Sequence, residues 1–278
     1  MIDFLKESTF AVNEVISKAW QVTKRNYFSI ATLSFLMFIT SSASGLMAFF
    51  LKDVNWGLRA LMAFIFIMFF FTINLSLFKY IFHLLDDEEH DVSIVSTIPT
   101  RQKIIRFLVA TLYFILCIIG VYSVVMVLGL PFVYAGIDLQ KVSNVAIPVG
   151  LVAIFITWIR ISFFPFFIID KKSTPFESIK LSLATTKGNF IKLLFILAGL
   201  VLVQAVVFGF FYVVVLTGFR LVNYFFDYDI NQYVSLIVVV FSSFVIVPFT
   251  TAFFTVAYRK IMNEYKGDEH PDIIHNIV

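Results

Sequence analysis

The sequence predicts an all-α integral membrane protein with about six transmembrane helices, arranged in three hairpins, and amphipathic cytoplasmic helices at the membrane surface. Of its 278 residues, 60% are hydrophobic and only 14% are charged, whereas soluble domains carry about 25% charged residues. Six apolar segments approach or exceed the roughly 20 residues that a helix needs to cross a bilayer. We expect a single polytopic domain, 1–278, with spans near 28–50, 59–84, 104–136, 143–169, 190–217 and 232–258.

Lysine and arginine predict the topology of these spans. Most of them fall in the N-terminal segment, in the stretches 79–106 and 171–192, and in the C-terminal segment. The opposite side is expected to carry only Lys52, Arg59, Lys141 and Arg220. Because loops rich in positive charge remain in the cytoplasm, we expect both termini on the cytoplasmic side.

The first segment, 1–27, is predicted to be an interfacial helix. Val12, Ile16, Ala19 and Trp20 recur at helical spacing and form an apolar face, with polar residues opposite. A signal peptide is the rival interpretation of the first apolar segment, because small residues follow at 41–45. The polar lead is long for a signal peptide, so we expect the segment to be retained.

A second interfacial helix is predicted at 174–188. Thr174 and Glu177 have the spacing of a capping box, with proline at the first helical position. Phe176, Ile179 and Leu183 share one face, and Gly188 stands where the helix would end. A lysine-flanked apolar face next to a span favours the membrane surface. A plain cytosolic connector helix is the alternative.

The two interfacial segments resemble one another. A shift of 163 residues aligns several positions and indicates an internal repeat in which a surface helix leads into a transmembrane hairpin. The segment 96–106 is a possible third, degenerate copy. The shared interfacial motif comprises Thr23, Lys24 and Asn26 in the first copy, and Thr186, Lys187, Gly188 and Asn189 in the second.

A longer pattern resembles a known family. It comprises Arg160, Pro165 and Asp170, then Pro-Phe-Glu-Ser at 175–178 and Ser-Leu-Ala-Thr-Thr-Lys-Gly-Asn-Phe at 182–190. This pattern resembles a group of bacterial six-helix membrane proteins. The group includes the membrane domain of glycerophosphoryl diester phosphodiesterases and similar uncharacterised integral membrane proteins. Leu183 replaces the usual tryptophan, which Trp20 supplies in the first copy. The resemblance implies a multi-pass protein of the bacterial inner membrane, and no hydrolase activity is carried over from the family to this chain.

Polar residues inside spans are the first candidates for function. Arg160 stands out because its planar guanidinium suits a lipid phosphate. A structural arginine paired within the protein, through the carbonyl of Ile161, Asn74 or Gln204, is the alternative. The candidate lipid or anion contacts are Arg160, Lys79, Lys171 and Lys172, although Lys79 also fits the role of an interfacial anchor.

Other chemistry is not indicated by the sequence. No carboxylate falls in the middle of a span, which argues against an ordinary ion-coupled transporter. The acidic run 86–91 lacks the glycines and ligand spacing of a calcium loop and is interpreted as a solvated cluster. Cys117 is interpreted as a packing residue. No catalytic motif, cofactor site or metal site is recognised, so we expect a non-enzymatic protein that binds no cofactor, metal or nucleic acid.

The sequence therefore favours a scaffold, an accessory subunit of a membrane complex, or a membrane-organising protein. Its expected partners are membrane lipids and other inner-membrane proteins, or a second copy of itself. Small residues four apart, at Ser41 and Gly45 and at Ala205 and Gly209, suit close helix contacts. The alternative is a transporter of lipids or small amphiphiles that uses Arg160 and the basic cytoplasmic face.

Overall fold

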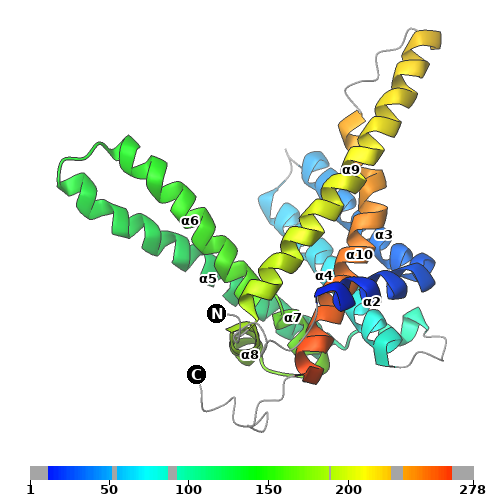
Figure 1. The fold of residues 1–278 in the computed structure, drawn as a ribbon, viewed down its shortest axis with the longest axis horizontal. Helices are drawn as coiled ribbons and strands as arrows, with labels where there is room; N and C mark the ends of the chain where they lie inside the picture. The colour runs from blue at the N-terminus through cyan, green and yellow to red at the C-terminus, as the bar shows by residue number, and fades with distance from the viewer. Residues whose placement is uncertain (1–11, 52–54, 87–92, 188, 227–233, 265–278) are drawn as a thin grey trace. The chain divides into compact units, whose positions relative to one another are not determined.

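The computed structural model describes residues 12–51, 55–86, 93–187, 189–226 and 234–264 (Figure 1). Every regular element in these ranges is helical. The chain divides into two compact units. Unit 1 contains the described parts of 100–194 and 261–264, and unit 2 contains those of 10–99 and 195–260.

Six helices in the described ranges are long and apolar enough to cross a membrane, which confirms the predicted number and is consistent with a multi-pass membrane protein. Each begins within four residues of its expected span, but the fifth ends at Phe226 and the sixth at Glu264, nine and six residues beyond the expected 217 and 258. The helices are α3 (Tyr27–Phe50), α4 (Trp56–Asp86), α5 (Arg101–Tyr134), α6 (Leu139–Ile161) with its continuation α7 (Phe164–Asp170), α9 (Phe190–Phe226) and α10 (Val234–Glu264).

Three shorter elements connect or precede these helices. They are α2 (Val12–Arg25), the 3-10 turn η1 (Ile94–Thr97) and α8 (Pro175–Lys187). The helices α2 and α8 fall inside the segments 1–27 and 174–188 that the sequence assigned to the membrane surface. Residues 1–11 and Gly188 lie outside the described residues, so the predicted helix end at Gly188 stays a prediction.

The core of unit 2 lies where α2, α3, α4 and α10 meet. Ile30 and Ile81 are fully buried in it. Val22 of α2 and Ala252 of α10 pack into the same cluster. The buried face of α2 comprises Val15, Ala19, Val22 and Thr23. Ile16 and Trp20, which the sequence placed on the apolar face, are 37% and 56% exposed, so the packed stripe is rotated away from them.

Two contacts join the last two long helices within unit 2. Phe211 of α9 stacks on Phe241 of α10, with ring centroids 6.1 Å apart. The Nε2 of Gln204 donates to Oγ1 of Thr250 at 3.3 Å. Gln204, a polar residue inside a predicted span, therefore has a partner on the neighbouring helix.

In unit 1, α5 and α6 pack side by side (Figure 1). Glycine allows their close approach at two points. A Cβ at Gly150 would lie 2.9 Å from Cδ2 of Tyr122, and a Cβ at Gly129 would lie 3.1 Å from Cγ1 of Val142. Larger residues there would push the two helices apart.

Proline affects the long helices in two ways. Both α5 and α10 continue through Pro131 and Pro248. Pro248 has no N–H to donate to the carbonyl of Phe244, four residues earlier. The hydroxyl of Tyr27 donates to that carbonyl at 3.2 Å. By contrast, the fourth span is interrupted just before Pro165, between Ile161 and Phe164.

Candidate functional site at the junction of α6, α7 and α8

The break between α6 and α7 is held by a hydroxyl of α8. The Oγ of Ser182 accepts a hydrogen bond from the amide of Phe163 at 3.1 Å and donates to the carbonyl of Arg160 at 3.0 Å. Ser182 is fully buried. Because a buried backbone group without a partner is costly, this side chain makes the break tolerable inside an apolar span.

Arg160 reaches from the end of α6 onto the same face of α8. Its Nε donates to Oγ1 of Thr186 at 3.2 Å, and its Nη2 donates to the carbonyl of Leu183 at 3.0 Å. The hydroxyl of Thr186 lies 3.0 Å from the carbonyl of Arg160. We call Arg160, Ser182, Leu183 and Thr186 the hydroxyl clasp. These partners differ from the three that the sequence suggested for Arg160.

The clasp determines which face of α8 packs inward. Four hydroxyl residues and Ile179 are buried, whereas Phe176 is 58% exposed. Sequence reasoning emphasised the apolar positions of this helix and missed the hydroxyls. The recurrence of Ser178, Ser182, Thr185 and Thr186 at helical spacing was the signal that could have identified this face.

The start of α8 has the predicted capping box. The amide of Glu177 donates to Oγ1 of Thr174 at 3.4 Å, and the amide of Thr174 donates to Oε2 of Glu177 at 3.1 Å. This reciprocal pair satisfies two backbone donors that the helix itself leaves unpaired. The cap and the clasp together fix both halves of α8.

Lys171 and Lys172 form the turn between α7 and α8, and both are exposed. Lys172 has a positive φ of 54°. Two cations of α5 hold this turn, since Nζ of Lys103 donates to the carbonyl of Ile169 at 2.7 Å and Nη1 of Arg106 donates to the carbonyl of Lys172. Cations at the end of a helix also compensate its dipole.

Lys79, the remaining candidate for an anion contact, lies in unit 2. Its Nζ donates to the carbonyl of Ser96 in η1 at 2.7 Å. The hydroxyls of Ser76 and Thr97 lie 2.7 Å apart beside it. Lys79 is therefore hydrogen-bonded to η1, the short turn that follows its own helix.

The N-terminal positions of the interfacial motif make local bonds of the same kind as their counterparts. Thr23 donates to the carbonyl of Ala19 at 2.8 Å. The side-chain amide of Asn26 lies 3.4 Å from the carbonyl of Val22, and that of Asn189 lies 3.4 Å from the carbonyl of Thr185. The two motif lysines, Lys24 and Lys187, are both exposed.

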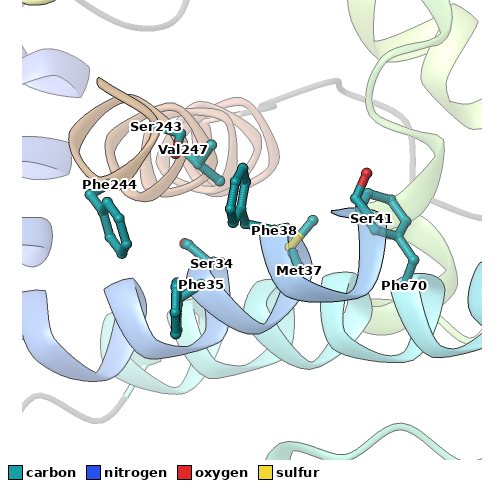
Figure 2. Close-up of a pocket in the computed structure, with 9 residues that line it drawn as sticks. All are labelled: Ser34, Phe35, Met37, Phe38, Ser41, Phe70, Ser243, Phe244 and Val247. Atoms are coloured by element: carbon teal, nitrogen blue, oxygen red, sulfur yellow. The ribbon is translucent and has the colours of Figure 1, made fainter. Parts of the chain in front are cut away.

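A pocket of about 200 Å³ lies between α3, α4 and α10 in unit 2. Phe35 and Phe38 of α3, Phe70 of α4 and Phe244 of α10 supply most of its aromatic wall (Figure 2). Two of its three serines form hydrogen bonds within their own helices. The hydroxyl of Ser34 donates to the carbonyl of Ile30, and that of Ser243 donates to the carbonyl of Val240. The pocket is apolar and offers no charged group.

The described residues contain no cluster of three or more histidine, cysteine or acidic side chains that could hold a metal ion. Most of the acidic run at 86–91 lies outside them, but Asp86 is described and accepts from Nη2 of Arg259 at 2.5 Å. Comparison with family models, curated proteins and solved structures gave no match.

Proposed function

We propose that this chain is a non-enzymatic inner-membrane protein that acts as a scaffold or accessory subunit of a membrane complex, or organises the membrane around it. One observation carries the proposal. The hydroxyl clasp and the capping box fix α8 to the end of the fourth span, while Phe176 and Lys187 are exposed. A rigidly held surface helix with an exposed aromatic and basic side suits recognition.

The proposed architecture has three hairpins, both termini in the cytoplasm and α2 and α8 at the membrane surface. The packing of α3 on α4 and of α5 on α6 supports the first two hairpins. The contacts of Phe211 and Gln204 with α10 support the third. The excess of lysine and arginine on one side supports the orientation. Membership of the bacterial six-helix group remains part of the proposal.

Lateral contacts would use α9. Ala205 and Gly209 are exposed on this helix, and a Cβ at Gly209 would meet nothing within 4 Å. Val206 and Phe210 beside them are 72% and 64% exposed. Small residues four apart let the backbone of a second helix approach closely. This surface suits a transmembrane helix of a partner or of a second copy.

Native purification in mild detergent, followed by mass spectrometry, tests the scaffold proposal. We expect reproducible co-purifying membrane proteins, and about a tenfold or greater loss of them for Phe176→Ala or Lys187→Gln. Tyr134→Ala and Arg220→Gln are matched controls, because each removes an exposed residue of the same kind elsewhere. A purely monomeric species without partners would contradict the proposal.

A transporter of lipids or small amphiphiles is the second candidate, because Arg160 lies at a helix break within a span. Its Nη1 donates no hydrogen bond within the described residues, so it is available to a phosphate. Arg160→Ala should abolish lipid flux in reconstituted vesicles. Thr186→Val weakens the same clasp but keeps the charge, and should retain flux. Equal flux from Arg160→Ala and the unaltered protein would exclude this candidate.

A further inference from the structure

A groove of about 460 Å³ runs between α5 and α6 in unit 1. This volume lies within the range of small-molecule sites, which are commonly apolar with a few placed polar groups. Leu128 and Phe132 of α5 and Val145 and Val149 of α6 are among its walls, and all four are more than half exposed. The groove therefore opens outward along the surface of the helix pair.

The groove has its shape because glycine and alanine stand at its floor. A Cβ at Gly129 would lie 3.1 Å from Val142 and 3.9 Å from the Cβ of Ala146. The absence of a side chain at 129 lets the two helix backbones approach closely, and the larger neighbouring side chains of α5 and α6 form the walls of the groove. A long, thin apolar group fits such a trough better than a globular one.

Lys141 is the single charged residue in the lining. It stands on the first turn of α6 and is exposed. The nearby carboxylate of Asp138 accepts from the amide of Gln140 at 2.9 Å, so it caps α6. Lys141 lies eight residues before Val149, which corresponds to about 12 Å along a helix. One leaflet of the hydrocarbon core is about 15 Å deep.

The groove has a cation at one end and an apolar trough nearly one leaflet deep. These features suit a ligand with an anionic headgroup and a long apolar chain. We propose that this groove binds one acyl chain of an anionic phospholipid, whose phosphate lies beside the ammonium of Lys141. Charge complementarity selects the headgroup, and the trough at Gly129 selects the chain. The site does not depend on the scaffold function, and it lies apart from the hydroxyl clasp.

Lipid retention in nanodiscs provides the test. The protein is reconstituted in an equal mixture of phosphatidylglycerol and phosphatidylcholine, and the lipids that remain bound after transfer to detergent are quantified by mass spectrometry. We expect enrichment of phosphatidylglycerol. Lys141→Gln should lower that enrichment about fivefold, the value of one lysine near an anionic surface. Arg220→Gln, which removes an exposed cation of α9, should leave it unchanged.

A second variant separates the chain from the headgroup. Val145 is 66% exposed, so Val145→Trp fills the trough with little risk to folding, and it should lower the retention of both lipids. Helix content measured by circular dichroism verifies the fold of each variant. Unchanged phosphatidylglycerol enrichment in Lys141→Gln, or unchanged total lipid retention in Val145→Trp, would overturn the proposal. Loss of co-purifying proteins with intact lipid retention would concern only the scaffold function.

Discussion

At the scale of single residues, Thr186 is the member of the hydroxyl clasp that contacts Arg160 twice. Its hydroxyl accepts from Nε and lies within hydrogen-bond distance of the arginine's carbonyl. The residue is fully buried. The same hydroxyl lies 2.8 Å from the carbonyl of Ser182 on its own helix, so it joins the side chain of Arg160 to the backbone of α8.

Thr186→Val should therefore destabilise the protein. The methyl group keeps the shape but removes the acceptor of Nε, and a partly buried donor left without a partner costs about 1 kcal/mol. Chemical unfolding in detergent would measure the loss. Thr186→Ser should restore most of it. Thr157→Val is the control, because among the described residues the hydroxyl of Thr157 bonds only the carbonyl of Ala153 on its own helix. An equal loss for both valine variants would contradict a special role for Thr186.

Tyr27 provides a second prediction at this scale. Its hydroxyl donates to the carbonyl of Phe244, the one that Pro248 leaves without a helical donor. Tyr27→Phe should cost about 1 kcal/mol of unfolding free energy. In a Pro248→Ala background, the amide of residue 248 takes over as donor, so the same substitution should cost almost nothing. A double-mutant cycle measures the coupling. Additive effects would show that the hydroxyl does not replace the missing amide of Pro248.

At the scale of elements, α8 shows what a single sequence can and cannot predict. Thr174 and Glu177 are three residues apart, so their capping box is visible in the sequence and is confirmed. The clasp is not visible there. Arg160 lies 23 and 26 residues from its two acceptors, and the contact exists only once α8 folds back onto α6. The packing of α8 against α6 therefore buries the hydroxyl face of α8 and leaves the side that carries Phe176 exposed.

The long helices were more predictable because membrane spans are defined by local composition. Uninterrupted apolar length alone located all six, from α3 to α10. The contact of Tyr27 with Phe244 spans 217 residues, and no local pattern announces it. The groove at Gly129 could not be predicted from local sequence for the same reason, because two helices form it together.

The cap of α8 can be tested separately from its clasp. Thr174→Ala removes the acceptor for the amide of Glu177 and should cost about 1 kcal/mol. Hydrogen exchange should then quicken in the first turn of α8, while the turn around Ser182 and Thr186 stays protected. Thr111→Ala, which removes a hydroxyl that bonds the carbonyl of Phe107 within α5, serves as the control. Faster exchange along the whole of α8 would mean that cap and clasp form one cooperative unit.

At the scale of the whole molecule, the topology depends on how many helices cross the bilayer between one charged turn and the next. The turn at Lys171 and Lys172 is held by cations at the beginning of α5, through Lys103 and Arg106. Lys141 stands near the other end of the same helix pair, on the first turn of α6. If α5 and α6 cross the bilayer as a hairpin, Lys141 and Lys172 lie on opposite faces of the membrane.

Cysteine labelling tests this arrangement directly. Cys117 is the single cysteine of the chain, so Cys117→Ser provides a background for Lys141→Cys and, separately, Lys172→Cys. A membrane-impermeant maleimide applied to cells made permeable only at the outer membrane should label position 141 and spare position 172. Inverted vesicles should show the reverse. Arg220→Cys should label with position 141, because α9 is expected to cross once between Lys187 and Arg220. Labelling of 141 and 172 from one side would rule out the hairpin, and with it the proposed orientation of the basic surface that carries α8.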